Sequence, residues 1–255
     1  MSQLHKLNTE NKVALITGAA RGIGRACCLA LAEAGADIVA GLRDINQDSG
    51  LIAELNEMGV KSLPVQMDVS EKKQIDSAVL AASDHFGKID ILVNNAGIAP
   101  ANPIVEYTEE DFDRTVNVNL KGTYFTSQAV GKLMIRQKFG RIINLSSQAG
   151  FIALPDESVY CMTKAGIAHL TTCFAAEWAE YNINVNAVAP TFIETPGTKK
   201  WLDDPEFKEN VLSKILLNKV GKPKDVSSAV VYLASPAGNM ITGTTLMIDG
   251  GWTAV

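Results

Sequence analysis

Cysteine is scarce in this sequence, and its cysteines have neither disulfide-framework nor zinc-site spacing. Cys27, Cys28, Cys161 and Cys173 lie in apolar stretches with helical spacing, where a cysteine is usually a small buried hydrophobe. Histidine is also rare, with three in the chain, and no group of His, Cys and carboxylate residues has the spacing of metal ligands. We therefore expect no metal site.

Long apolar runs and an excess of positive charge are absent as well. No stretch approaches the roughly 18 uncharged apolar residues that a membrane span needs, and residues 1–12 lack the apolar segment of a secretory signal. The net charge of −5 provides no electrostatic footprint for nucleic acid or an anionic membrane. We therefore expect a cytoplasmic protein that binds neither nucleic acid nor membranes.

What the sequence does contain is an ordinary globular composition. Hydrophobic residues make up 47% and charged residues 20% of the 255 residues, and a single α/β domain of this size is common. No linker, internal repeat or low-complexity segment interrupts the chain. We therefore expect one domain over residues 1–255.

Short apolar runs alternate with amphipathic stretches along the chain. The pattern predicts strands over residues 13–17, 37–42, 61–68, 89–95, 141–147, 182–190 and 244–251. It predicts helices over residues 22–35, 46–58, 109–135 and 158–181, one N-capped by Ser70 and a last one after Pro223. This alternation is typical of a Rossmann-like, doubly wound α/β fold, a parallel sheet of seven strands with helices on both faces. Ligands of such sheets bind beyond the carboxyl ends of the strands.

A glycine-rich turn, TGAARGIG (17–24), follows the first predicted strand. Gly18, Gly22 and Gly24 allow a tight turn, close approach of the backbone to a pyrophosphate and close helix–strand packing. The helix that begins there offers free N–H groups and the positive end of its dipole to the phosphates. The turn therefore predicts a nucleotide site, although its spacing is Gly-x-x-x-Gly-x-Gly rather than the commoner Gly-x-Gly-x-x-Gly.

This turn and five further features together resemble the short-chain dehydrogenase/reductase family over nearly the whole chain. The features are MDV (67–69), NNAG (94–97), NLKG (119–122), Ser147 and the Tyr160-x-x-x-Lys164 pair. Ser147 precedes Tyr160 by 13 residues, the usual interval in the family. The resemblance implies a single NAD(P)-binding catalytic domain with a substrate lid over about residues 191–218. One segment departs from the pattern, because APTFIETP (189–196) has Pro190-Thr191 where relatives usually have Pro-Gly.

The resemblance also implies which residues form the site. Four of them would be catalytic: Asn119, Ser147, Tyr160 and Lys164. The cofactor would contact Gly18, Arg21, Gly22, Ile23, Gly24, Arg43, Asp68, Val69, Asn95, Ala96, Gly97, Tyr160, Lys164, Ile193 and Thr195. The substrate would contact Ser147, Gln148 and Tyr160. By chemistry alone Ser146 and Asn117 are comparable candidates, and only the interval and the Asn-x-x-Gly match favour Ser147 and Asn119.

Tyr160 and Lys164 share one face of their predicted helix, because residues four apart are neighbours there. A phenol, with a pKa near 10, is a poor base at neutral pH. A lysine cation about 4 Å away would favour the phenolate by about 4 kcal/mol at an effective dielectric constant of about 20. We therefore predict that Tyr160 is the base in alcohol oxidation and the acid in ketone reduction. By resemblance, Ser147 would bind the reacting oxygen, Lys164 the nicotinamide ribose and Asn119 a water molecule.

The residues after the second predicted strand bear on the choice between NAD and NADP. Leu42 stands where NAD-preferring relatives usually carry aspartate, and Arg43 follows it. A guanidinium suits a 2′-phosphate, and Arg21 of the glycine turn could reach the same group. Asp44 could instead accept a hydrogen bond from a free 2′-hydroxyl. We favour NADP(H), with NAD(H) as the alternative.

The sequence determines the substrate less closely. Gln148 and the pair Asp156-Glu157 could bind hydroxyl groups of a polyol or sugar, or could cap a helix. A sugar, sugar acid or polyol ranks first, a 3-oxoacyl thioester is the alternative, and a regulator without catalytic activity is a third hypothesis. The predicted helices through TYFTSQAVGKLMI and 158–176 carry few charges, and relatives pair these helices between subunits. We therefore expect a homotetramer, with a dimer as the alternative.

Overall fold

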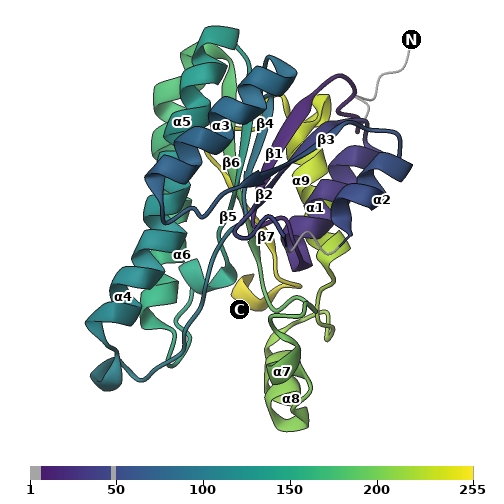
Figure 1. Ribbon diagram of the computed structural model, residues 1–255. Coiled ribbons are helices and arrows are strands. Elements are labelled where there is room, and N and C mark those ends of the chain that lie inside the picture. The colour runs from purple at the N-terminus through teal and green to yellow at the C-terminus, as the bar shows by residue number, and fades with distance from the viewer. Residues whose placement is uncertain (1–6, 47–49, 255) are drawn as a thin grey trace.

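The computed structural model describes residues 7–46 and 50–254 and is built around a parallel sheet (Figure 1). In the described residues, seven strands pair in the order β3-β2-β1-β4-β5-β6-β7. They are β1 (Val13–Thr17), β2 (Asp37–Leu42), β3 (Ser62–Gln66), β4 (Ile91–Asn94), β5 (Gly140–Leu145), β6 (Ile183–Pro190) and β7 (Thr245–Ile248). Every neighbouring pair is parallel. The predicted seven-stranded parallel sheet is therefore confirmed.

Helices cover both faces of this sheet. They are α1 (Gly22–Glu33), α2 (Leu51–Glu57), α3 (Lys72–Phe86), α4 (Glu109–Val116), α5 (Gly122–Gln137), α6 (Ser158–Trp178), α7 (Lys199–Leu202), α8 (Pro205–Lys214) and α9 (Pro223–Ala234). Helices α1 and α9 pack together on one face, and α3, α5 and α6 on the other (Figure 1). Successive side chains of β1 pack against different helical layers. Leu15 and Ile16 point to opposite faces of the sheet and belong to different core clusters.

The strand order places a switch point between β1 and β4. Strands β2 and β3 lie on one side of β1, whereas β4 to β7 lie on the other. Crossovers from the two central strands therefore leave in opposite directions and open a crevice at their carboxyl ends, where ligands bind in sheets of this kind. The glycine turn follows β1 and the NNAG segment begins at the end of β4, so both lie at this crevice.

Two helix starts differ from the prediction. Helix α3 begins at Lys72 with Glu71 as its N-cap, one residue later than expected. The Ser70 hydroxyl donates to the Asp68 carboxylate at 2.7 Å instead of capping the helix. The helix expected over 46–58 is α2, which begins at residue 51, and residues 47–49 of that prediction lie outside the described part of the chain.

The helix expected over 109–135 contains an irregular turn. Helices α4 and α5 are joined by a π-helical segment, Asn117–Lys121. Such segments are rare and are found frequently at functional sites. Asn119 lies in this one and is fully buried.

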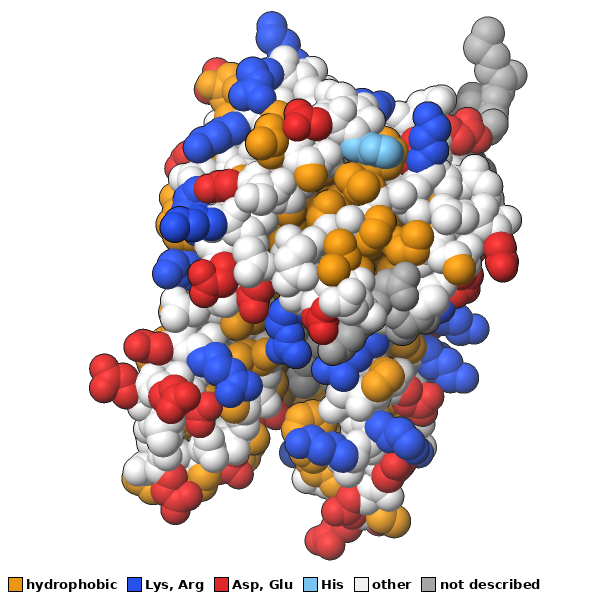
Figure 2. All heavy atoms as spheres, in the orientation of Figure 1, with side chains coloured by type: hydrophobic (Ala, Val, Ile, Leu, Met, Phe, Trp, Pro, Cys, Tyr) orange, Lys and Arg blue, Asp and Glu red, His pale blue; other side chains and the backbone are white. Residues whose placement is uncertain are grey.

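The segment after β6 leaves the sheet and forms the short helices α7 and α8, which project beyond the carboxyl ends of the strands (Figure 1). Asp204 caps α8 by accepting from the N–H of Glu206 at 3.0 Å. Figure 2 shows a hollow between the lobe that carries α4 and the lobe that carries α7 and α8. The segment is thus partly helical, and its role as a lid over residues 191–218 remains a prediction.

Other sequence features can be located directly. Cys27 and Cys28 are buried as expected, whereas Cys173 on α6 is exposed. Among the described residues, no helix is long and apolar enough to cross a membrane. In the same residues, no group of three or more His, Cys, Asp or Glu side chains could hold a metal ion.

Candidate active site

The glycine turn has the geometry of an anion cradle. Gly18 and Gly22 have φ of +65° and +58°, a left-handed conformation that favours glycine. A Cβ on Gly24 would lie 2.3 Å from the carbonyl oxygen of Gly18, so helix and turn meet too closely for any side chain. Arg21 is the N-cap of α1 but its side chain makes no capping hydrogen bond. The first N–H groups of α1 therefore remain free to bind a phosphate.

The NNAG segment holds this turn in place. The Asn95 side-chain amide donates to the carbonyl oxygens of Thr17 (2.9 Å) and Gly18 (3.1 Å). The backbone N–H groups of Asn95 and Ala96 both donate to the Thr17 hydroxyl at 3.0 Å. These bonds tie the end of β4 to the end of β1. Asn95 therefore acts first as a support for the turn, and Gly97 lies farther along at the cavity described below.

The MDV segment lies at the end of β3 and is held by its own turn. The Asp68 carboxylate accepts from the N–H (2.9 Å) and the hydroxyl (2.7 Å) of Ser70. Val69 packs so closely on the start of α5 that a Cβ on Gly122 would lie 2.9 Å from its side chain. The glycine of NLKG is thus required by this contact.

Ser147, Tyr160 and Lys164 converge on one cavity of about 330 Å³. Its wall also includes Ile23 of the glycine turn, Asn95 and Gly97 after β4, and Pro190 to Ile193 after β6. Ends of four strands thus meet here, as the sheet topology predicts. The Ser146 hydroxyl donates to the Lys164 carbonyl oxygen at 2.8 Å. Ser146 is therefore engaged by the backbone, whereas Ser147 donates to Gln148 Oε1 at 2.8 Å.

Lys164 is buried, with 4% of its surface exposed. Its Nζ donates to the Leu145 carbonyl oxygen at 2.6 Å and lies 5.5 Å from the centroid of the Tyr160 ring. Helix α6 begins at Ser158, so the pair occupies its first two turns. The predicted proximity of the phenol and the ammonium is therefore present.

The predicted lowering of the Tyr160 pKa is absent. Burial raises the pKa of Tyr160 to about 12; the neighbouring Ser147 hydroxyl lowers it, and Glu157 and Cys161 raise it further. Burial lowers the pKa of Lys164 to about 8. The prediction of a lowered pKa for Tyr160 is thus wrong for the protein alone, because burial is the largest influence on the phenol.

Asn119 is anchored between two parts of the site. Its Oδ1 accepts from the N–H of Ile98 at 2.8 Å, and its Nδ2 donates to the Ile98 carbonyl oxygen (2.9 Å) and the Thr163 hydroxyl (3.1 Å). Thr163 precedes Lys164 on α6. Asn119 therefore fixes the segment after β4 against the catalytic helix.

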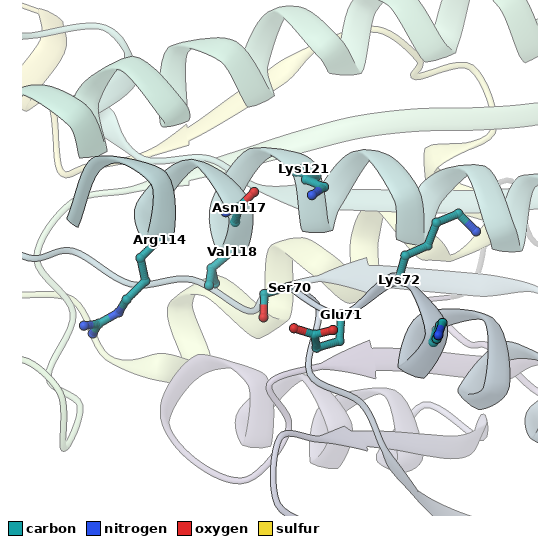
Figure 3. A pocket seen from close by; sticks show the side chains of 8 residues that line it. Ser70, Glu71, Lys72, Arg114, Asn117, Val118 and Lys121 are labelled. Carbon is teal, nitrogen blue, oxygen red and sulfur yellow. The ribbon is translucent and has the colours of Figure 1, made fainter. Parts of the chain in front are cut away.

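Asn117 belongs to a different hollow, of about 660 Å³. Figure 3 shows that the loop before α3, with Ser70 and Glu71, faces Val118 and Lys121 of the π-helical segment. No residue of the Ser147, Tyr160 and Lys164 cavity lines it. Of the two asparagines that the sequence offered, Asn119 is the one that lies near Tyr160.

The segment after β6 connects the cofactor turn with the cavity. Ile193 is buried, and Thr195 lies 3.5 Å from the position of a Cβ on Gly22. The Thr195 hydroxyl is held at 3.1 Å from that of Thr198. Thr195 therefore lies beside the glycine turn, and Ile193 lines the cavity.

Of the polar residues predicted to bind substrate, two line the cavity and one does not. Gln148 is 2% exposed and lines the cavity, as does Glu157, whose pKa is raised by burial. Asp156 is exposed, has φ of +64° and does not line the cavity. The site also contains Leu154 and Trp201, which the sequence reasoning did not select. Their only signal was their position after β5 and β6.

The residues at the end of β2 differ in burial and in hydrogen bonding. Leu42 is fully buried, and Arg43 and Arg21 are exposed. Asp44 accepts from the N–H of Asn46 at 3.0 Å, in a turn of its own loop. Arg21 therefore lies exposed in the glycine turn, and Arg43 lies exposed after β2, the strand that pairs with β1.

Comparisons with known proteins agree with this geometry. A family model described as enoyl-(acyl carrier protein) reductase matches residues 18–253. The 3-oxoacyl-(acyl-carrier-protein) reductase of Thermotoga maritima is 42% identical over 96% of this chain and 99% of its own length. The chain belongs to the short-chain dehydrogenase/reductase family. The protein is accordingly an NAD(P)-dependent oxidoreductase of the alcohol dehydrogenase and ketone reductase type.

Two further members of the short-chain dehydrogenase/reductase family extend the comparison. The NAD-dependent glycerol dehydrogenase of Listeria innocua is 40% identical over 96% of this chain and 95% of its own. The crystal structure of a gluconate 5-dehydrogenase from Burkholderia cenocepacia, in complex with NADP and tartrate, matches with a TM-score of 0.96 and 34% identity. That match covers all of both chains. Close relatives thus differ both in cofactor and in substrate.

The lowered pKa of Lys164 predicts a pH-dependent stability. From pH about 8 to the ordinary lysine value of 10.5, the unfolded chain binds the proton that the folded chain has lost, so the free energy of unfolding rises with pH. In denaturant unfolding from pH 7 to about 10, the free energy of unfolding of the wild type should rise relative to that of Lys164→Met. Over the full interval between the two pKa values the rise would be on the order of 3 kcal/mol. Tyr160, with its raised pKa, opposes this trend only above about pH 10. Parallel curves for the two proteins would mean that the buried amine keeps its proton.

Proposed function

We propose that this oxidoreductase interconverts a secondary alcohol and a ketone in a sugar, sugar acid or polyol, with Tyr160 as the general acid and base. The convergence of Ser147, Tyr160 and Lys164 on one cavity that also reaches the glycine turn carries this proposal. The turn fits a dinucleotide, because Gly24 leaves no room for a Cβ and the first turn of α1 is uncapped. When bound, the nicotinamide supplies or accepts the hydride and, in its oxidised form, carries a positive charge.

The side chains have distinct tasks in this proposal. Ser147 donates to the reacting oxygen and stabilises the charge that develops there. Tyr160, which is protonated at neutral pH in the protein alone, supplies its proton in ketone reduction, and in alcohol oxidation its deprotonated form takes the proton from the substrate hydroxyl. Lys164 binds the ribose of the cofactor and favours the phenolate by its charge. Asn119 keeps the segment after β4 against α6, which preserves the distance between cofactor and phenol.

The preferred cofactor in this proposal is NADP(H), with NAD(H) as the alternative. Arg21 in the glycine turn and Arg43 after β2 are exposed, and guanidinium groups suit a 2′-phosphate. Leu42 is buried and apolar, and Asp44 is engaged by Asn46. Among the relatives, the Listeria glycerol dehydrogenase is named as NAD-dependent, and the gluconate 5-dehydrogenase structure contains NADP.

Replacing Arg43 tests this preference. Arg43→Ala should raise the KM for NADPH about tenfold, the effect expected from losing one charge-assisted hydrogen bond at an exposed site. The KM for NADH should change less than about twofold, because NADH lacks the phosphate. Arg136→Ala, an exposed arginine on α5, is the matched control. Equal changes for the two cofactors would remove Arg43 from the phosphate site.

Two polar side chains in a largely apolar cavity favour a hydroxylated substrate. Gln148 and Glu157 line it close to Tyr160, and the named activities of two relatives concern glycerol and gluconate. A 3-oxoacyl thioester is the second candidate, because the Thermotoga relative is named for that activity. A protein without catalysis is a weaker hypothesis, since the full Ser, Tyr and Lys set is present.

A substrate panel with a tyrosine variant tests the activity. Consumption or formation of reduced cofactor should be followed with polyols, sugars, sugar acids and 3-oxoacyl thioesters. Tyr160→Phe should lower kcat about 10³-fold on the best substrate, while the Kd for NADPH stays within about threefold. Tyr232→Phe, on the exposed side of α9, should leave both unchanged. Retained turnover in Tyr160→Phe would end the assignment of the phenol, and turnover of thioesters alone would select the second candidate.

A homotetramer remains our proposal for the assembly, with a dimer as the alternative. Large apolar side chains are exposed on the helices concerned: Tyr124 (40%) on α5, and Met162 (45%) on α6. Both residues lie on the two helices that relatives pair between subunits, and this position supports the proposal. Light scattering that found only monomers would exclude both states.

A further inference from the structure

Glu157 brings a carboxylate to the wall of the catalytic cavity, and the mechanism above does not use it. The residue is half-buried and lines the cavity together with Ser147 and Tyr160. It is the N-cap residue of α6, but its side chain makes no capping hydrogen bond. In the described part of the chain, no basic group forms an ion pair with it. The helix-capping role that the sequence allowed for this carboxylate is therefore absent.

Backbone hydrogen bonds on both sides of Glu157 fix its place in this wall. Its N–H donates to the Leu154 carbonyl oxygen at 3.3 Å, and its own carbonyl oxygen accepts from the Cys161 N–H at 2.8 Å. The carbonyl oxygen of Asp156, the preceding residue, accepts from the Asn102 N–H at 2.8 Å. The start of α6 is thus joined to the loop after β5 and to the segment after β4.

Glu157 precedes the proposed acid and base, Tyr160, by three residues at the start of the same helix. Residues at this spacing are neighbours on a helix surface, and both of these line the cavity. The charge of Glu157 also acts on the phenol. Burial has the largest effect on the pKa of Tyr160, and the carboxylate raises that pKa further. A charged substrate group that is bound beside the phenol would therefore interact with the same carboxylate.

The cavity wall offers little positive charge to balance this carboxylate. Among the described residues that line it, Lys164 is the one basic side chain. Its Nζ donates to the Leu145 carbonyl oxygen, and the proposed function assigns it to the ribose of the cofactor. A partly buried carboxylate without a cation is unfavourable for folding, and such groups are typical of functional sites.

We infer that Glu157 is a specificity residue that selects uncharged polyols over sugar acids. This inference rests on the proposed function and narrows its substrate class. An ionised carboxylate accepts hydrogen bonds from the hydroxyls of a polyol, and it repels the carboxylate of a sugar acid. The ordinary pKa of a glutamate is 4.5; burial raises the pKa of Glu157, whereas the positive end of the α6 dipole favours its ionised form. Glu157 therefore carries its charge at neutral pH.

The test compares an alditol with the aldonic acid of the same carbon skeleton, such as glucitol with gluconate. The two differ at one end, where a hydroxymethyl group replaces a carboxylate. The wild type should have the higher kcat/KM on the alditol. Glu157→Gln keeps the size of the side chain and removes its charge. It should lower the alditol-to-acid ratio of kcat/KM about 30-fold, because the repulsion between two carboxylates is removed. Any change in the phenol affects both substrates alike and leaves this ratio unaltered.

The neighbouring residue provides a matched control. Asp156→Asn removes a carboxylate that is exposed and outside the cavity, so it should leave the ratio within about twofold of the wild-type value. Glu157→Asp keeps the charge and should keep most of the preference for the alditol. The Tm and the Kd for NADPH should stay near the wild-type values in all three variants. A ratio that Glu157→Gln leaves unchanged, or that Asp156→Asn lowers equally, would overturn the inference.

The outcome for the wild type distinguishes this inference from the proposed function. If the wild type converts hydroxylated substrates but prefers the aldonic acid to the alditol, the proposed function stands and only the role of Glu157 is rejected. If the wild type converts no hydroxylated substrate, the proposed substrate class is rejected and the inference is rejected with it.

Discussion

The hydrogen bond from Lys164 to the carbonyl oxygen of Leu145 is the contact on which the site depends. It joins the first turns of α6 to the end of β5 at 2.6 Å, in a place where water is excluded. The Ser146 hydroxyl returns a second bond to the backbone of Lys164 at 2.8 Å. Two bonds in opposite directions therefore fix strand and helix, and with them the relative positions of Ser147 and Tyr160.

Burial at this junction has an electrostatic cost that appears in both side chains. In the described part of the chain no carboxylate forms an ion pair with this amine. Burial lowers the pKa of Lys164 to about 8 and raises the pKa of Tyr160 to about 12. A hydrophobic pair would pack with less cost. Burying these two polar groups together thus lowers the stability of the fold, which is common where the groups are needed for chemistry rather than for folding.

Some parts of this site could be predicted from the sequence, and the reasons differ by residue. The interval between Ser147 and Tyr160 and the turn between Tyr160 and Lys164 are local, so spacing was enough to find them. The direction of the Tyr160 pKa depends on burial by residues distant in the chain, and the prediction failed there. Spacing also gave no sign of the π-helical turn at Asn119, whose amide bonds to Ile98 and Thr163, residues distant from it in the sequence.

Thr191 illustrates how a departure from a family pattern becomes informative once the structure is known. In the sequence it was only a departure from the usual Pro-Gly pair. In the fold it follows β6 and lines the cavity of Ser147 and Tyr160. Tyr160 and Lys164 lie on α6 and Ser147 follows β5, whereas Thr191 follows β6. Because these are different elements, the substrate can change in this fold while the Tyr160 and Lys164 junction stays the same.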